Sequence, residues 1–278
     1  MNSPLVSATW LYEHREAPNL VILDASIEFQ IPAETDKDTE NLIPRSRRFD
    51  YDKIICDQRS PLPHMMPTDA EFNQRVQALG INQDSIIVVY DNSGTFASPR
   101  AYWMFKAMGH QQVYILDGGL TEWKFCGYPV VQSYEVAEQL GDFTGVLNPS
   151  YFVDADFVER HIGNTSSLTI DARGLVRFLA QVPEPRPGVR SGHIPNSVCL
   201  PFATLMDGHR VKPVEALNDV VKAVLGEQHN QYIFSCGSGV TACILALTAE
   251  LCGYHNLSVY DGSWTEWGQD TNRPISIG

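Results

Sequence analysis

The chain has 278 residues, 44% of them hydrophobic, which is enough for two domains of ordinary size with buried cores. Its net charge of −13 argues against nucleic acid as a partner, because phosphate binding needs a basic surface. We expect no membrane partner, since no apolar run approaches the roughly 18 residues of a membrane span. The N-terminus lacks the pattern of a signal peptide, and six scattered cysteines without a CxxC pair predict neither disulfides nor a metal site. These features favour a reducing, cytoplasmic location.

The first half of the chain alternates strand-like and helix-like patterns. Strands are predicted where β-branched runs end in polar or Gly residues, at VILDA (21–25), SIIVVYD (85–91) and VYILDGG (113–119). A helix is predicted to follow from Ser98, with Ser98 as its N-cap and Pro99 in its first position. Strands that alternate with helices predict a parallel sheet covered on both faces, with the functional site at the carboxyl ends of the strands.

The second half of the chain repeats the first. Four pairs of segments keep the same order at offsets of 144 to 151 residues, which predicts two copies of one domain. The pairs are VILDAS (21–26) with LTIDAR (168–173), LIPRS (42–46) with HIPNS (193–197), IIVVYDNSG (86–94) with QYIFSCGSG (231–239), and VYILDGGLTEW (113–123) with LSVYDGSWTEW (257–267). We predict domains at 1–132 and 151–278, joined by a linker at 133–150 that is polar and contains Gly and Pro.

One stretch of the second copy carries the predicted chemistry. Tyr232–Ser235 is predicted to be a buried strand, followed by Cys236, a loop with two glycines, and an apolar helix from about Val240 to Gly253. Backbone N–H groups and the positive end of the helix dipole favour an anion at such a turn, and the thiolate of cysteine is the nucleophilic form. The first copy has Asp91 at the corresponding position, so only the second copy can use cysteine chemistry.

Other anion-binding loops are excluded by the residues of this one. A Walker loop would end in Gly-Lys-Ser/Thr, whereas this loop ends in Gly239-Val240-Thr241. A protein-phosphatase loop would have an arginine six residues after the cysteine, where this chain has Ala242. The loop contains no cation, so a charged substrate group must be held by residues from elsewhere in the chain.

These residues resemble a known family. The tandem repeat, the cysteine in the second copy alone, CGSGVTA at the loop and YDGSWTEWG near the end are similar to the two-domain rhodanese-like sulfurtransferases. The loop CGSGVT looks like that of the 3-mercaptopyruvate sulfurtransferases. The resemblance implies that Cys236 takes sulfur from 3-mercaptopyruvate as a persulfide, releases pyruvate, and passes the sulfur to cyanide or to a thiol such as thioredoxin. It implies no metal or other cofactor.

The resemblance also implies residues for substrate binding. Arg177 and Arg186 match the family arginines that bind the carboxyl and keto groups, a task that suits the planar guanidinium. Gly237, Gly239, Val240 and Thr241 are expected to bind substrate through the loop backbone. Arg190 is a weaker candidate. His193 is interpreted as a structural turn residue.

A proton relay is implied near the cysteine. Ser238, His64 and Asp52 match a serine–histidine–aspartate relay of this subtype, which would move a proton between substrate thiol and product enolate. His64 and Asp52 lie in a long insertion, residues 36–68 of the first copy, so the relay would draw on both copies.

Three alternatives remain open. Thiosulfate is a possible donor, although a dianion should require cations beside the cysteine and the loop has none. A non-catalytic rhodanese-like interaction module would be expected to lack the cysteine in both copies. A redox protein would cycle Cys236 with Cys243 or Cys252, both of which are predicted to lie in the helix core.

Overall fold

Two five-stranded parallel sheets form the centres of two units in the computed structural model, which describes residues 3–278. The strand order is β1-β5-β4-β2-β3 in the first sheet and β6-β12-β11-β7-β8 in the second, so the two sheets have the same topology. The first sheet consists of β1 (Leu5–Val6), β2 (Leu20–Asp24), β3 (Ser46–Arg48), β4 (Ile86–Tyr90) and β5 (Val113–Leu116). The second consists of β6 (Phe152–Val153), β7 (Ser167–Asp171), β8 (Val198–Cys199), β11 (Gln231–Ser235) and β12 (Leu257–Tyr260).

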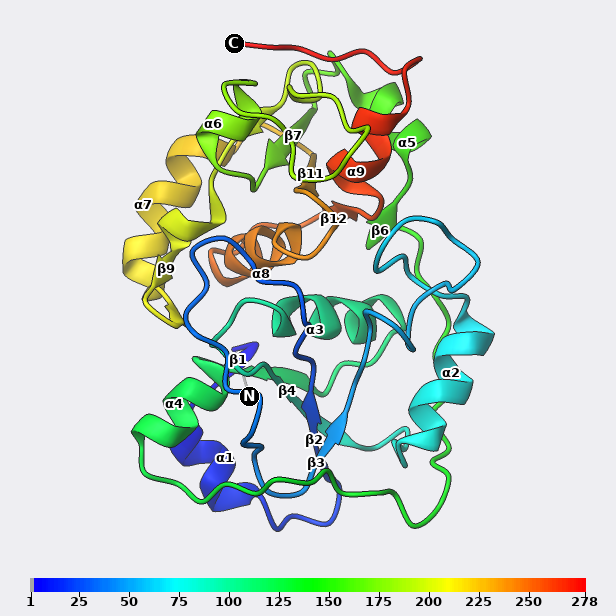
Figure 1. Ribbon diagram of the computed structural model, residues 1–278, viewed down its shortest axis with the longest axis vertical. Coiled ribbons are helices and arrows are strands. Elements are labelled where there is room, and N and C mark those ends of the chain that lie inside the picture. The colour runs from blue at the N-terminus through cyan, green and yellow to red at the C-terminus, as the bar shows by residue number, and fades with distance from the viewer. Residues whose placement is uncertain (1–2) are drawn as a thin grey trace. The chain divides into compact units, whose positions relative to one another are not determined.

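Helices cover both faces of each sheet (Figure 1). In the first unit these are α1 (Ala8–His14), α2 (Asp69–Ala78), α3 (Ser98–Ala107) and α4 (Gly119–Phe125). In the second unit they are α5 (Ala155–His161), α6 (Leu175–Phe178), the 3₁₀ turn η1 (Phe202–Leu205), α7 (Val214–Leu225), α8 (Ala242–Leu251) and α9 (Ser263–Gln269). A short hairpin is formed by β9 (Met206–Asp207) and β10 (Arg210–Val211). The alternating strand and helix patterns of the sequence therefore predicted the fold class correctly.

The alternation of side chains along each strand explains why both faces need cover. In β4, Val88 and Tyr90 belong to the core that includes residues of α1 and α4, so Ile87 and Val89 point to the opposite face. All four of these side chains are buried. The second unit repeats this arrangement, with one core formed by residues of α5, α9 and the sheet and with α8 packed on β11 and β12.

Neither unit consists of one continuous stretch of the chain. The first unit runs to Arg59, resumes at Met66–Asn148 and includes Asp207–Val211. The second unit comprises Ser60–Met65, Pro149–Met206 and Lys212–Gly278. Each unit thus contains a short segment that lies in the other half of the sequence.

The segment predicted as a linker, 133–150, packs on the first unit for most of its length. The N–H of Gly141 donates to the carbonyl of Gln77 (2.8 Å), and the N–H of Phe143 donates to that of Ile81 (3.1 Å). Phe143 is fully buried, and a Cβ added to Gly141 would lie 1.9 Å from the Ile81 oxygen, so only glycine fits there. The boundaries 1–132 and 151–278 stay a prediction.

The predicted start of the helix at Ser98 was wrong in one detail. Ser98 is the first residue of α3, its N-cap is Ala97, and that cap makes no side-chain hydrogen bond. The carboxylate of Asp91 replaces a capping side chain, because it accepts from the N–H groups of Ala97 (2.9 Å) and Ser98 (2.8 Å). Sequence rules for helix capping consider the residues next to the helix start, so they do not predict a cap supplied from seven positions upstream.

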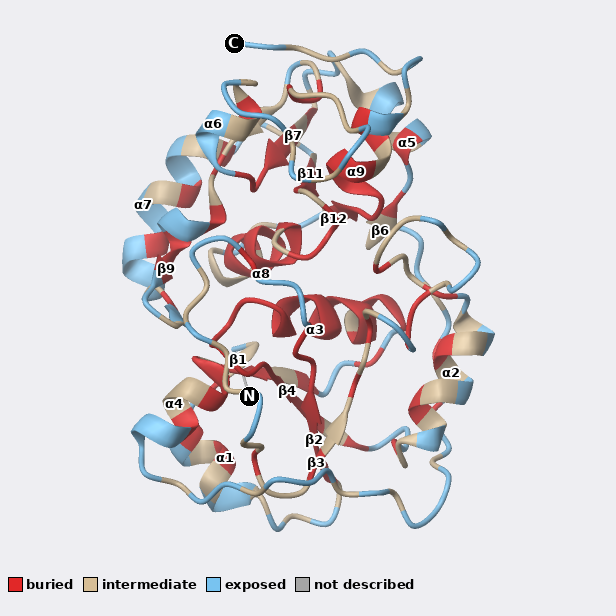
Figure 2. Ribbon diagram, in the orientation of Figure 1, coloured by how far each residue is buried: buried red, intermediate tan, exposed pale blue. Residues whose placement is uncertain are grey.

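The strands bring the predicted site to one edge of the second sheet. Asp171 at the end of β7 pairs with Ser235 at the end of β11, and Cys236 follows Ser235 directly. The helix that follows the loop, α8, begins at Ala242 and is buried along most of its length (Figure 2). The chain leaves this helix through Gly253 at φ +82°, a left-handed conformation that favours glycine.

Candidate active site

The sulfur of Cys236 lies inside the turn between β11 and α8. The side chain is buried, with 2% of the residue exposed, and its Sγ accepts a hydrogen bond from the N–H of Gly239 (3.1 Å). Gly239 has φ +77°, so glycine is favoured at the position that aims this N–H at the sulfur. A backbone donor directed at the sulfur stabilises its ionised form.

The segment Ser263–Thr265 holds the two peptide units that begin the loop. The N–H of Cys236 donates to the hydroxyl of Ser263 (3.1 Å), and the N–H of Trp264 donates to the carbonyl of Cys236 (3.0 Å). The carbonyl of Gly237 accepts from both the N–H (2.9 Å) and the hydroxyl (2.6 Å) of Thr265. The motif DGSWTEW therefore fixes the conformation of the cysteine loop.

The equivalent loop of the first unit shows what such a turn can bind. Asp91, which takes the place of Cys236, is fully buried, and its carboxylate accepts five backbone N–H groups at 2.8–3.4 Å. The donors belong to Ser93, Gly94, Phe96, Ala97 and Ser98. The backbone of this turn thus directs five N–H groups at one carboxylate.

The two arginines predicted to bind substrate lie beside the cysteine loop. Arg177 is partly exposed, and a Cβ added to Gly237 would lie 3.6 Å from its Nη2. Arg186 donates from Nη1 to the hydroxyl of Thr265 (2.8 Å), the same hydroxyl that holds the carbonyl of Gly237. Two guanidinium groups are therefore anchored near Cys236, and their role in binding substrate stays a prediction.

A buried ion-pair network under the loop was missed by sequence reasoning. Arg173, 3% exposed, donates to both oxygens of Asp171, to Glu184 (2.9 Å) and to the carbonyl of Gly192 (2.7 Å). Burial acts to lower the pKa of Arg173, but the surrounding negative charges, the Cys236 sulfur among them, outweigh it and raise that pKa. One signal was present in the sequence: the aligned repeats read Asp-Ala-Ser in the first copy and Asp-Ala-Arg in the second.

The residues of the predicted relay lie in different units. Ser238 is a buried residue of the cysteine loop, and the buried His64, at φ +64°, belongs to the segment Ser60–Met65 of the second unit. Asp52 belongs to the first unit, in a turn where its N–H donates to Asp50 Oδ1 (3.1 Å). The relay of these three side chains stays a prediction.

Two further residues singled out in the sequence hold the backbone together. Arg190 donates to four carbonyl groups, those of Trp267, Gly268, Asp270 and Arg273. His193 stacks on Phe178 with ring centroids 3.8 Å apart, and its Nδ1 is hydrogen bonded to the carbonyl of that residue (2.8 Å). These contacts agree with the structural role predicted for His193. Arg190 likewise contacts backbone carbonyl groups and so stabilises the local fold.

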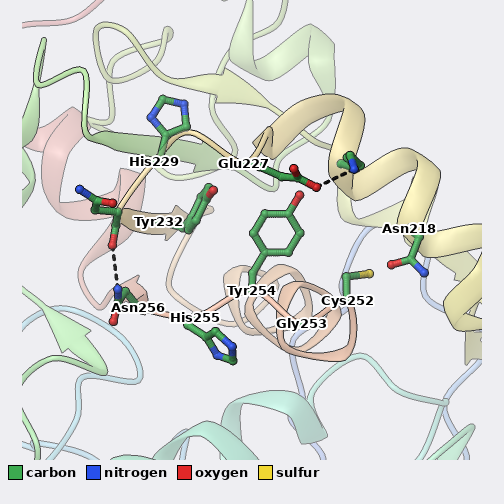
Figure 3. Close-up of a pocket in the computed structure, with 11 residues that line it drawn as sticks. Asn218, Glu227, His229, Tyr232, Cys252, Gly253, Tyr254, His255 and Asn256 are labelled. Carbon is green, nitrogen blue, oxygen red and sulfur yellow. Dashed lines mark hydrogen bonds and ion pairs between the residues drawn. The ribbon is translucent and has the colours of Figure 1, made fainter.

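The geometry argues against a disulfide between Cys236 and Cys252. The ten-residue helix α8 separates them and spans about 15 Å, far beyond disulfide reach. Cys252 instead lines a cavity of about 490 Å³ at the amino ends of β11 and β12, together with Tyr232, Tyr254 and neighbouring residues (Figure 3). The buried Cys243 donates from Sγ to the carbonyl of Gly239 (3.3 Å), and none of the six cysteines, all within the described residues, forms a disulfide.

Comparison with known proteins identifies the family. Residues 7–126 and 154–270 each match the family described as the Rhodanese-like domain. The 3-mercaptopyruvate sulfurtransferase of Escherichia coli K12 is 34% identical over 97% of this chain and 96% of its own length. Thiosulfate/3-mercaptopyruvate sulfurtransferase 1, mitochondrial, of Arabidopsis thaliana is 36% identical over 99% of this chain and 78% of its own length. The crystal structure of SseA from Escherichia coli, described as a 3-mercaptopyruvate sulfotransferase, has a TM-score of 0.81 at 32% identity and covers 95% of this chain and 99% of SseA.

The chain therefore belongs to the rhodanese-like family, with two tandem copies of the domain, as its repeat and its loop predicted. Among residues 3–278, every helix is too short or too polar to cross a membrane. Across the same residues, His, Cys, Asp and Glu side chains do not gather in a group of three or more suited to a metal ion.

Proposed function

We propose that this chain is a 3-mercaptopyruvate sulfurtransferase that carries sulfur on Cys236. The observation that carries the proposal is the hydrogen bond from the N–H of Gly239 to the Cys236 sulfur, in a turn whose duplicate surrounds the carboxylate of Asp91. Relatives at 34–36% identity over nearly the whole chain carry that activity in their names.

The first half-reaction transfers sulfur to the enzyme. The Cys236 thiolate attacks the sulfur of 3-mercaptopyruvate, an S–S bond forms, and the C–S bond of the substrate breaks. Its electron pair passes to the enolate of pyruvate, which takes a proton to give pyruvate. Arg177 and Arg186 bind the carboxylate and keto oxygens of the substrate, and Ser238, oriented by His64 and Asp52, moves the proton.

The loop backbone suits the persulfide that results. In the first unit one oxygen of Asp91 accepts from the N–H groups of Phe96 and Ala97, and the repeat aligns these with Thr241 and Ala242. We infer that the outer sulfur of the Cys236 persulfide takes the place of that oxygen. Preorganised donors at this point would stabilise the negative sulfur without reorganisation.

The second half-reaction returns the enzyme to its starting state. A thiolate attacks the outer sulfur, the S–S bond of the persulfide breaks, and Cys236 leaves as the thiolate. We propose a protein thiol such as thioredoxin as the acceptor, with cyanide able to replace it in the test tube, and a cytoplasmic location. The absence of cysteine pairs in the sequence favours that reducing environment.

Thiosulfate is the second candidate donor. One relative names both donors, but a dianion requires more positive charge than a monoanion, and Gly237 to Thr241 supply none. A purely structural module is disfavoured because Cys236 and its donor are both in place.

The decisive experiment compares turnover of 3-mercaptopyruvate and thiosulfate by the purified chain, with a thiol acceptor. We expect higher kcat/KM for 3-mercaptopyruvate and, without acceptor, a mass increase of one sulfur atom. Cys236→Ser should abolish both signals while the circular dichroism spectrum is retained. Cys252→Ser, at the far end of α8, is the matched control and should remain active. Turnover by Cys236→Ser would place the chemistry elsewhere.

A further inference from the structure

Glu184 joins two guanidinium groups at the edge of the candidate site. Its side chain is 3% exposed, and its carboxylate accepts from Nε (3.1 Å) and Nη2 (2.5 Å) of Arg177. The same carboxylate accepts from Nη1 of the buried Arg173 (2.9 Å). One buried carboxylate therefore holds both the arginine under the loop and an arginine that we propose contacts substrate.

Glu184 offsets part of the positive charge of the arginines beside the cysteine loop. Three guanidinium groups, those of Arg173, Arg177 and Arg186, stand against two carboxylates, those of Asp171 and Glu184. These five groups leave one positive charge, and the thiolate form of Cys236 that the proposed reaction uses would balance it. A bound donor with one negative charge then adds a single uncompensated charge, whereas a dianion adds two.

We propose that Glu184 determines which sulfur donor the enzyme accepts, an inference that rests on the proposed function. By neutralising Arg177 it lowers the positive potential at the site, so that a donor with a single carboxylate binds and the dianion thiosulfate is disfavoured. Its bidentate contact covers the Nε edge of the guanidinium. That contact fixes the orientation of the Arg177 guanidinium beside the cysteine loop, where Nη2 is the nitrogen closest to Gly237.

The test replaces the charge and keeps the shape. In Glu184→Gln, we expect the ratio of kcat/KM for thiosulfate to that for 3-mercaptopyruvate to rise about tenfold, mainly through a lower KM for thiosulfate. That size corresponds to one unit charge several ångströms away at an effective dielectric constant of about 20, reduced by salt. The rise should shrink as ionic strength increases.

A matched control is available at the other end of the sheet. Glu227 forms an ion pair with Lys222 at the rim of the cavity beyond the amino end of β11 (Figure 3). Glu227→Gln removes the same charge from the chain and should leave the donor ratio unchanged. A rise in both variants would assign the effect to net charge and would overturn the proposal.

A second measurement on the unaltered chain remains decisive if Glu184→Gln does not fold. Methanesulfonate and sulfate are both tetrahedral, with one and two charges, and we expect methanesulfonate to inhibit at the lower concentration. Stronger inhibition by sulfate, or loss of turnover on both donors in Glu184→Gln with an unchanged ratio, would overturn the role of Glu184. Failure of the unaltered chain to use 3-mercaptopyruvate would instead refute the proposed function.

Discussion

Replacing Asp91 by asparagine tests the claim that this turn is built to hold a negative group. The carboxylate is fully buried, with Oδ2 facing the N–H groups of Phe96, Ala97 and Ser98 and Oδ1 facing that of Gly94. An amide of the same shape has only one acceptor oxygen. Whichever way it is turned, its NH₂ group must face N–H groups that also need an acceptor.

The size of the loss follows from those contacts. A hydrogen bond to a charged group contributes about 1.5–3 kcal/mol, and a buried donor left unsatisfied costs about 1–3 kcal/mol. The amide of asparagine keeps the hydrogen bonds that its oxygen accepts and loses those that the second carboxylate oxygen accepted. We therefore expect Asp91→Asn to lower the free energy of unfolding by about 3 kcal/mol and the melting temperature by on the order of 10 °C.

Urea unfolding followed by tryptophan fluorescence measures this loss. Asp57→Asn is the matched control, since Asp57 lies at the surface of the same unit and accepts from Arg59 alone among the contacts described. It should change stability little, as exposed ion pairs contribute little. A loss below about 1 kcal/mol in Asp91→Asn would refute the idea that the backbone donors favour an anion.

Three further predictions concern the site and the core. Arg186→Ala should raise the KM for 3-mercaptopyruvate by about ten- to a hundredfold, because a charge-assisted hydrogen bond to the carboxylate is lost. The KM for thiosulfate should rise much less. Equal effects on the two donors in steady-state assays would show that Arg186 does not bind the carboxylate. His64→Ala should slow turnover of 3-mercaptopyruvate and shift its pH–rate profile, and an unchanged profile would discard the relay. Burial lowers the pKa of His110, so the unfolded chain binds more protons below about pH 6.5, and the free energy of unfolding should fall as the pH drops from 7. Denaturant titrations at several pH values should show a smaller fall in His110→Gln.

The fold was predictable because its signals are local. Short β-branched runs, the helical patterns between them and the repeated order of motifs each lie within a few residues, and together they define two parallel sheets. Cys236 could be proposed as the reactive residue for the same reason, since strand, cysteine, glycine loop and helix are contiguous.

The missing parts of the site depend on contacts between distant segments. Glu184 lies eleven residues after Arg173 and seven after Arg177, and nothing in its neighbourhood predicts that it joins them under the loop. The hydrogen bonds of the Asp91 carboxylate to its own loop were not predicted. Comparison of the two repeats showed only that this position is not a cysteine. The difference between Ser26 and Arg173 at aligned positions was visible, and it marks the copy with a cation next to its loop cysteine.

The exchange of short segments between the units has a consequence for any attempt to dissect this protein. A cut between Asn148 and Pro149 yields two fragments, and each lacks residues that complete its own unit: Asp207–Val211 for the first and Ser60–Met65 for the second. The second fragment would leave His64 behind. Neither half of the sequence, expressed alone, therefore contains all the residues of its own unit.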